Sequence, residues 1–130
     1  MSLRTRSAAL LLVVASAALL TGCAPGGPGI DSIDSLTFHQ SQALPSFDGG
    51  TYTQDDAAQV KRFVALLKKD GVDPATYRAR DTGGCTGGLT TVVKVGYSGS
   101  STTHEMTIKG CGKSSGFEHD ANALFSGWKK

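Results

Sequence analysis

The first 22 residues limit the fold more than any other part of the sequence. Two arginines, Arg4 and Arg6, precede an uncharged apolar run from Ala8 to Leu20, and small residues follow that run. This layout is typical of a secretory signal that is removed from the mature protein, and the run is shorter than the roughly 20 apolar residues that a membrane-spanning helix needs. We therefore predict a signal peptide over residues 1–22. Its removal leaves 108 of the 130 residues, which is enough for one domain.

The four residues Leu20-Thr21-Gly22-Cys23 resemble the lipobox of bacterial lipoproteins, which consists of an aliphatic residue, a small residue, Gly or Ala, and Cys. The resemblance implies cleavage between Gly22 and Cys23 and a diacylglycerol group on the Cys23 sulfur. In many bacteria of this kind the new amine is acylated as well. Two or more acyl chains hold a protein at a membrane, because each buried methylene contributes about 0.8 kcal/mol. The alternatives are an ordinary signal peptide with an incidental cysteine, or a retained anchor.

A short tether follows the predicted lipid site. Residues 24–29 are Ala, Pro and Gly only, and they span at most about 3.5 Å each when extended. We expect residues 23–30 to form the lipidated cysteine and a flexible tether, and residues 31–130 to form a single extracytoplasmic domain close to the cell membrane.

Charge gives no reason to expect a polyanionic partner. The whole chain carries a formal net charge of +2, but this excess comes from Arg4 and Arg6, and without them 11 basic residues balance 11 acidic ones. A neutral domain with scattered charges has no electrostatic footprint for nucleic acid. We therefore expect no nucleic-acid partner.

The cysteines indicate a disulfide. Once Cys23 carries lipid, Cys85 and Cys111 remain as an even pair in an exported domain, where disulfides form and persist. Closing a loop of this length contributes roughly 3 to 4 kcal/mol in the chain-entropy model. A redox or metal-binding role is the alternative, but neither cysteine belongs to a Cys-x-x-Cys pair or to two close pairs of zinc ligands.

Hydrophobic periodicity predicts six elements. Apolar and polar residues alternate over 35–40 and 76–80, which predicts two strands. An amphipathic helix of about 16 residues is expected between them, with Thr53 as its cap, Asp56 supporting its first turn and Gly71 as its end. A hairpin follows, with a strand over 89–97, a turn at 98–101 and a return strand that contains Met106 and Ile108.

A terminal helix closes the chain, with an apolar stripe made of Phe117, Ala121, Leu124, Phe125 and Trp128. The predicted order is therefore β-α-β-β-β-α. Tight turns between strands favour an antiparallel sheet, and helices with one apolar face cover one side of such a sheet. We predict an α+β fold: an antiparallel sheet of about four strands, two amphipathic helices and one disulfide.

No motif for catalysis or cofactor binding is present. The glycines around Cys85 lack the Lys-Ser/Thr and the helix of a phosphate loop. His39, His104 and His119 stand in three different segments, whereas a metal site needs ligands that converge. Among the acidic pairs, Asp55 with Asp56 is explained by a helix start and Asp31 with Asp34 lies near the tether, and neither specifies an acid-base pair for catalysis. We expect no cofactor and no metal, and we expect Phe125 and Trp128 to be core residues rather than an exposed binding ledge.

These observations favour a non-enzymatic binding or interaction domain that faces an unknown protein, peptide or envelope ligand. In its general layout from Ser35 to Trp128 the chain resembles small lipoproteins of high-GC Gram-positive, actinobacterial type. One alternative is a protease inhibitor of the subtilisin-inhibitor type, which is similar in size and export but has a second disulfide. Another is a small cell-envelope enzyme that uses His104 or His119 with an adjacent carboxylate.

Overall fold

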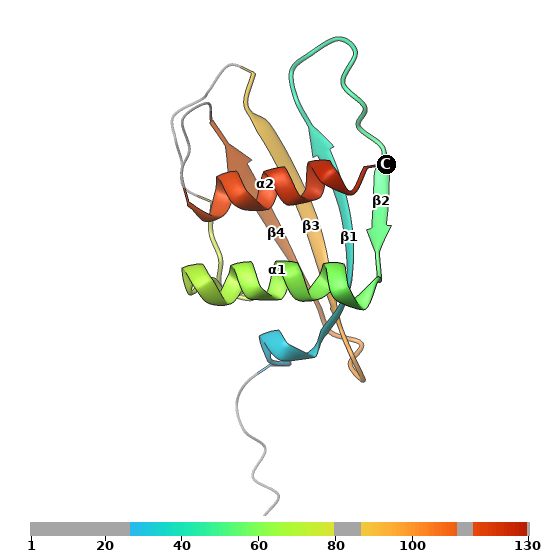
Figure 1. The fold of residues 1–130 in the computed structure, drawn as a ribbon, viewed down its shortest axis with the longest axis vertical. Helices are drawn as coiled ribbons and strands as arrows, with labels where there is room; N and C mark the ends of the chain where they lie inside the picture. Colours follow the sequence, from blue (N-terminus) through green and yellow to red (C-terminus); the bar gives the residue numbers. More distant parts are fainter. Residues whose placement is uncertain (1–26, 80–86, 112–115, 130) are drawn as a thin grey trace, which may run out of the picture.

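The domain consists of one antiparallel sheet with two helices on one of its faces (Figure 1). The computed structural model describes residues 27–79, 87–111 and 116–129. The predicted signal peptide, Cys23 and Cys85 lie outside this part of the chain. The elements in chain order are η1 (Ile30–Ser32), β1 (Ile33–Ser41), β2 (Thr51–Gln54), α1 (Ala57–Asp70), β3 (Leu89–Tyr97), β4 (Thr103–Gly110) and α2 (Phe117–Gly127).

The four strands lie in the order β2-β1-β3-β4, and each neighbouring pair is antiparallel. Phe38 of β1 faces Tyr52 of β2 on one side and Val93 of β3 on the other. Because successive side chains of a strand point to opposite faces, one face of the sheet is apolar and the other is polar. The predicted α+β class, the four-stranded antiparallel sheet and the two helices are confirmed.

The core lies between the apolar face of the sheet and the helices. Phe38 packs against Phe125 of α2 at a ring-centroid distance of 4.8 Å, and Phe125 packs against Phe63 of α1 at 5.2 Å. The buried apolar residues run from Ile33 to Phe125. Ile30, the last residue of the predicted tether, packs against the edge of this core, and the other described core residues follow it in the chain. Residues 24–130 therefore contain all of these core residues and are expected to fold without the signal and the lipid.

The start of α1 differs from the prediction. Asp56, not Thr53, is the N-cap, and its carboxylate accepts a hydrogen bond of 2.9 Å from the backbone N–H of Gln59. Thr53 was the wrong residue because it belongs to β2, where it pairs with Thr37. The helix has 14 residues rather than about 16, and it ends as predicted at Gly71, whose φ of 64° is the left-handed conformation that glycine adopts easily.

The strand predicted over 76–80 is also wrong, as far as the described residues 76–79 show. The backbone N–H groups of Thr76 and Tyr77 donate to the carbonyl of Asp73, which makes this segment a turn. The ring of Tyr77 packs edge-on against Phe117 at 5.4 Å. The fourth strand is instead β2, which precedes α1, so the elements follow the order β-β-α-β-β-α.

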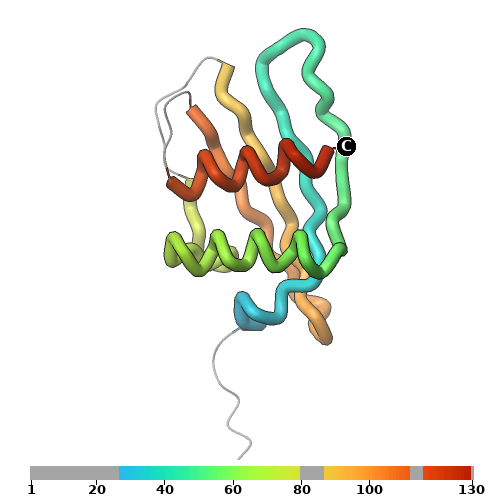
Figure 2. Tube along the Cα trace, viewed as in Figure 1, coloured from blue at the N-terminus to red at the C-terminus, as the bar shows by residue number. Residues whose placement is uncertain are grey.

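The two ends of the sheet differ in what they carry. At one end the chain enters through η1, and the backbone N–H of Ser98, in the β3–β4 turn, donates to the carbonyl of Ser32. At the other end lie the β1–β2 loop, the start of β3 and the end of β4 (Figures 1 and 2). We call these the tether end and the distal end. The nine residues of β1 separate them by roughly 26 Å.

No helix within the described ranges is long and apolar enough to span a bilayer.

Candidate functional site

A pocket lies at the distal end of the sheet, beside α2. Its volume is about 300 Å³. The lining comes from the β1–β2 loop, from the start of β3, from the end of β4 and from one side of α2: Gln42, Gly87, Gly88, Leu89, Gly110, His119, Asn122, Ala123 and Ser126. We call it the distal pocket. No lysine, arginine or carboxylate is among these residues, and the lining is mostly apolar surface with a few polar side chains.

A chain of hydrogen bonds runs from the exposed Ser126 at the pocket to the buried polar side chains Gln40, Thr91 and Asn122. The Ser126 hydroxyl donates to Gln40 Oε1 at 3.1 Å, and Gln40 Nε2 donates to Thr91 Oγ1 at 3.0 Å and to the Asn122 backbone carbonyl at 3.2 Å. The Thr91 hydroxyl then donates to Asn122 Oδ1 at 2.5 Å. Gln40 and Thr91 have exposed fractions of 1% and 0%, so the chain connects β1, β3 and α2 inside the protein.

The direction of this hydrogen-bond chain is fixed at one point. A backbone carbonyl only accepts, so the Gln40 atom next to the Asn122 carbonyl must be the amide nitrogen. That nitrogen also donates to Thr91 Oγ1, which leaves the threonine hydrogen for Asn122 Oδ1. The Asn122 amide nitrogen, Nδ2, is therefore turned away from the chain.

Asn122 Nδ2 is buried and has no hydrogen-bond partner among the described atoms. It lies against Gly110, another residue of the pocket lining, where a Cβ atom would be only 2.5 Å from it. A glycine at position 110 is therefore needed to make room for the Asn122 side chain. An unpaired buried donor costs about 1 to 3 kcal/mol, which makes Asn122 the most unusual polar residue of the pocket.

The rim of the pocket is held by Gln42, whose Nε2 donates to the Gly87 carbonyl at 2.7 Å. Gly87 has a φ of 79°, a backbone conformation that glycine adopts easily and that residues with a Cβ atom rarely adopt. This contact ties the end of β1 to the start of β3.

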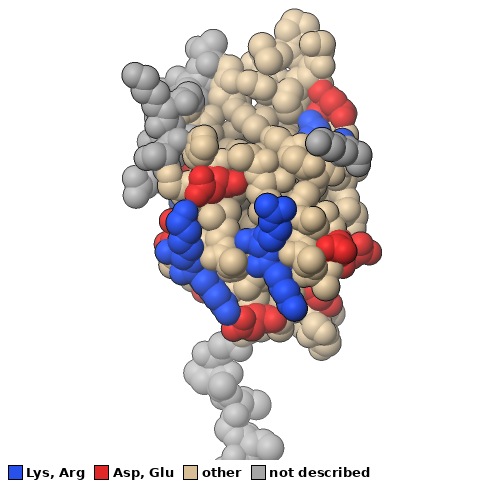
Figure 3. Space-filling model, viewed as in Figure 1, with Lys and Arg blue, Asp and Glu red and all other residues tan. Residues whose placement is uncertain are grey.

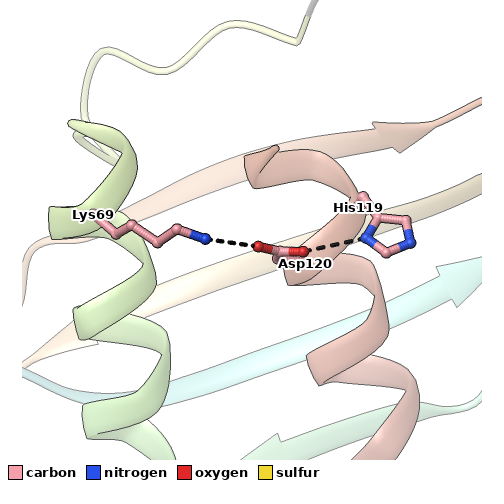
Figure 4. A network of polar contacts seen from close by, with 3 residues as sticks. All are labelled: Lys69, His119 and Asp120. Atoms are coloured by element: carbon pink, nitrogen blue, oxygen red, sulfur yellow. Dashed lines mark hydrogen bonds and ion pairs between the residues drawn. The ribbon is translucent and has the colours of Figure 1, made fainter. Parts of the chain in front are cut away.

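His119 lies at the edge of the pocket and bonds to a neighbour rather than into it. Its Nδ1 is 3.2 Å from Asp120 Oδ1, and Asp120 Oδ2 accepts from Lys69 of α1 at 3.1 Å (Figure 4). The hydrogen bond from His119, followed by that from Lys69, lowers the pKa of Asp120 from its usual value. The three residues form an exposed bridge between the two helices.

The other histidines lie elsewhere. His104 Nδ1 is 2.9 Å from the Tyr97 hydroxyl near the tether end, and burial, followed by the charge of Asp73, raises the pKa of Tyr97. His39 is on the polar face of the sheet, opposite Val92 and Thr51. In the described ranges no group of three or more His, Cys, Asp or Glu residues could hold a metal ion.

The acidic pairs have structural partners. Asp56 caps α1, and Asp31 forms an ion pair with Lys68 of α1 near the tether end. The stripe on α2 is a core stripe as predicted: Phe125 is fully buried, and the partly buried Trp128 donates from Nε1 to Gln59 at 3.0 Å.

Cys111 is half-buried and follows directly after β4, whose last residue, Gly110, pairs with Leu89. This register brings the end of β4 to the start of β3, as the disulfide prediction requires. The pairing with Cys85 stays a prediction, because Cys85 lies outside the described residues.

The surface over the helices carries charges of both signs next to each other (Figure 3). A groove of about 510 Å³ lies there, lined by residues of both helices that include Gln59, Arg62 and Trp128. Unlike the distal pocket, this groove has no buried unpaired polar atom among the described side chains, so it is the weaker candidate for a binding site.

Comparisons with protein-family models, with curated proteins and with solved structures give no match. The site therefore rests on its own geometry. Sequence reasoning did not single out Gln40 or Asn122, although a signal was present. Gln40 follows Leu36 and Phe38 at a period of two, and Asn122 stands three residues before Phe125 on the buried side of a helix.

Proposed function

We propose that this chain is a lipid-anchored extracytoplasmic binding domain that presents its distal pocket away from the cell membrane. The observation that carries the proposal is the opposite placement of the tether and the pocket. The chain leaves the predicted lipid site at Cys23 and enters the domain at the tether end, and the pocket lies at the distal end. A short tether then directs the pocket toward ligands of the envelope.

A binding role is favoured over catalysis by the arrangement of the polar groups. Ser126 and His119 both line the distal pocket, but they are seven residues apart on α2, which is roughly 10 Å along a helix. The Ser126 hydroxyl also donates to Gln40 instead of to a base. A nucleophile and its base must be within hydrogen-bond reach, and this pair does not meet that condition.

The lipid anchor is tested by Cys23→Ser in the full chain, expressed in a bacterium that processes lipoproteins. We expect the substitution to abolish labelling with a fatty-acid analogue and to leave the precursor unprocessed, with its signal peptide still attached. Thr21→Ala is the matched control because it keeps a small residue at that position of the lipobox, and it should be labelled as the original chain is. Normal labelling and processing of Cys23→Ser would contradict the proposal.

A further inference from the structure

We propose that the distal pocket binds the amide carbonyl of a short peptide, and that Asn122 Nδ2 is the donor that recognises it. This inference rests on the proposed function, because it names the ligand class of that binding domain. It joins two independent observations: a pocket at the distal end and a buried donor without a partner in its lining.

The donor is held in place for such a contact. Asn122 is only 5% exposed, and its Oδ1 is held by the Thr91 hydroxyl. Rotating the amide would place an acceptor at Gly110 and would leave the Thr91 hydrogen without the acceptor that it has now. A donor that is fixed before binding loses little freedom when the ligand arrives.

The ligand should carry a hydrogen-bond acceptor, because the buried Asn122 Nδ2 donor has no partner in the free protein. Pairing a buried donor recovers the cost of its desolvation, so a ligand oxygen at Nδ2 is favoured over any apolar group. Nδ2 is covered by Gly110 in this structure, so we expect a small displacement of the β4 end when the oxygen enters.

The charge and size of the pocket select among ligands that carry an acceptor oxygen. A phosphate or a carboxylate is normally met by Arg or Lys, and neither residue lines the distal pocket. A neutral amide carbonyl fits this lining better. A volume of about 300 Å³ is at the lower limit of ligand pockets, which suits one or two residues of a peptide.

The test is an NMR titration of the soluble domain, residues 24–130, labelled with ¹⁵N. The probe is N-acetyl-dialanine methylamide, which is neutral and offers three amide carbonyls, and n-butylammonium, which has no acceptor oxygen, is the control probe. We expect saturable shifts of the Asn122 side-chain amide and of the backbone N–H groups of Gly88, Gly110 and Ala123 with the peptide probe, and none with the control probe.

One variant tests the donor, and a second variant tests the pocket. Asn122→Asp keeps the size and the acceptor for Thr91 but removes the Nδ2 donor, and it should weaken binding at least fivefold. Ala123→Leu adds bulk at an exposed lining position, and it should also weaken binding at least fivefold. Ala58→Leu is the matched control, because it makes the same change at an exposed position of α1 outside the pocket, and it should bind as the original domain does. If Asn122→Asp does not fold, Ala123→Leu still tests the location of the binding site, and the shift of the Asn122 side-chain amide in the unsubstituted domain tests the donor.

Three results would overturn the inference: no saturable shift with the peptide probe, equal shifts with n-butylammonium, or unchanged affinity in a folded Asn122→Asp variant or in Ala123→Leu. The titration contains no membrane. Its failure therefore leaves the lipid anchor standing, and failure of the Cys23→Ser experiment leaves the ligand site standing.

Discussion

Thr91 places one hydroxyl between two amides inside the protein. It accepts from Gln40 and donates to Asn122, and it therefore sets the orientation of the amide that we assign to ligand recognition. No apolar residue of the same shape reproduces both contacts.

We predict that Thr91→Val lowers the free energy of unfolding by about 1 to 3 kcal/mol. The shape of the residue is kept, but Asn122 Oδ1 loses the hydroxyl that donates to it, and Gln40 Nε2 keeps only the Asn122 carbonyl as an acceptor. Urea denaturation measures the change. The matched control is Thr90→Val, the same substitution one residue earlier on the opposite, polar face of the sheet, which should stay within about 0.5 kcal/mol. Equal midpoints for the two variants would show that the buried chain contributes nothing.

Residues of the candidate site were harder to predict than residues of the core. The two-residue period placed Thr91 on the inner face together with Val93 and Val95, and the structure confirms this position. Gln40 has the same period relative to Phe38, but a glutamine inside a core is recognised as part of a site only when its partners are known. Those partners come from β3 and α2, 51 and 82 positions away, and no local pattern brings them together.

At the scale of elements, both helices end at a glycine, but the two glycines have different backbone conformations. Gly71 ends α1 with a φ of 64°, whereas Gly127 ends α2 without a positive φ and with open space around its Cβ position. We predict that Gly71→Ala lowers the free energy of unfolding by about 1 kcal/mol and that Gly127→Ala leaves it equal or raises it slightly. Thermal unfolding followed by circular dichroism measures both. A destabilisation of the same size in the two variants would be inconsistent with this assignment.

The bridge between the helices predicts a dependence on pH. Because the folded pKa of Asp120 lies below its usual value of 3.8, the stabilisation that it gives is present above the unfolded pKa and is lost as the pH falls through the folded pKa. We predict that Asp120→Asn is less stable than the original domain at pH 7, and that the difference disappears at an acidic pH below the folded pKa of Asp120. Urea midpoints at both pH values test this, with Asp55→Asn at another exposed position as the control. A difference that stays constant down to low pH would argue against the bridge.

Long periodic elements were predictable, and the short strand was not. The helices and the hairpin follow their sequence periods over eight residues or more, and they lie where these periods place them. The four residues of β2 are alternately exposed and half-buried, which gives no hydrophobic signal, and only pairing with β1 makes them a strand. The sequence does alternate over 76–80. The segment is nevertheless a turn after Pro74, because Asp73 accepts hydrogen bonds from the backbone N–H groups of the residues that follow.

At the scale of the whole molecule, the predicted disulfide would tie the start of β3 to the end of β4 beside the distal pocket. We predict that Cys85 and Cys111 are linked, and that the intact mass of residues 24–130 rises by the mass of two hydrogen atoms on reduction. Reduction should also lower the free energy of unfolding by roughly 3 to 4 kcal/mol. Alkylation of both cysteines without reductant would show that they are free thiols.

The entry of the chain into the domain and the distal pocket lie at opposite ends of the sheet, and the central claim of the proposed function is that a lipid anchor on Cys23 makes this arrangement direct the pocket away from the membrane. The turn between β3 and β4 is joined to η1 at the tether end, while the β1–β2 loop extends at the distal end (Figure 1). A lipid on Cys23 then places the two loops at different distances from the bilayer.

The most direct test compares nitroxide labels at Ser101→Cys in the β3–β4 turn and at Ser46→Cys in the β1–β2 loop, both exposed positions. The lipidated mature protein, residues 23–130, is placed in vesicles whose headgroups chelate Ni²⁺, and the relaxation of each label by the metal is measured, with the unsubstituted protein as the labelling control. We predict strong relaxation at position 101 and weak relaxation at position 46, where the sheet adds roughly 26 Å of separation. Equal relaxation at both positions, stronger relaxation at position 46, or none at either would contradict the account.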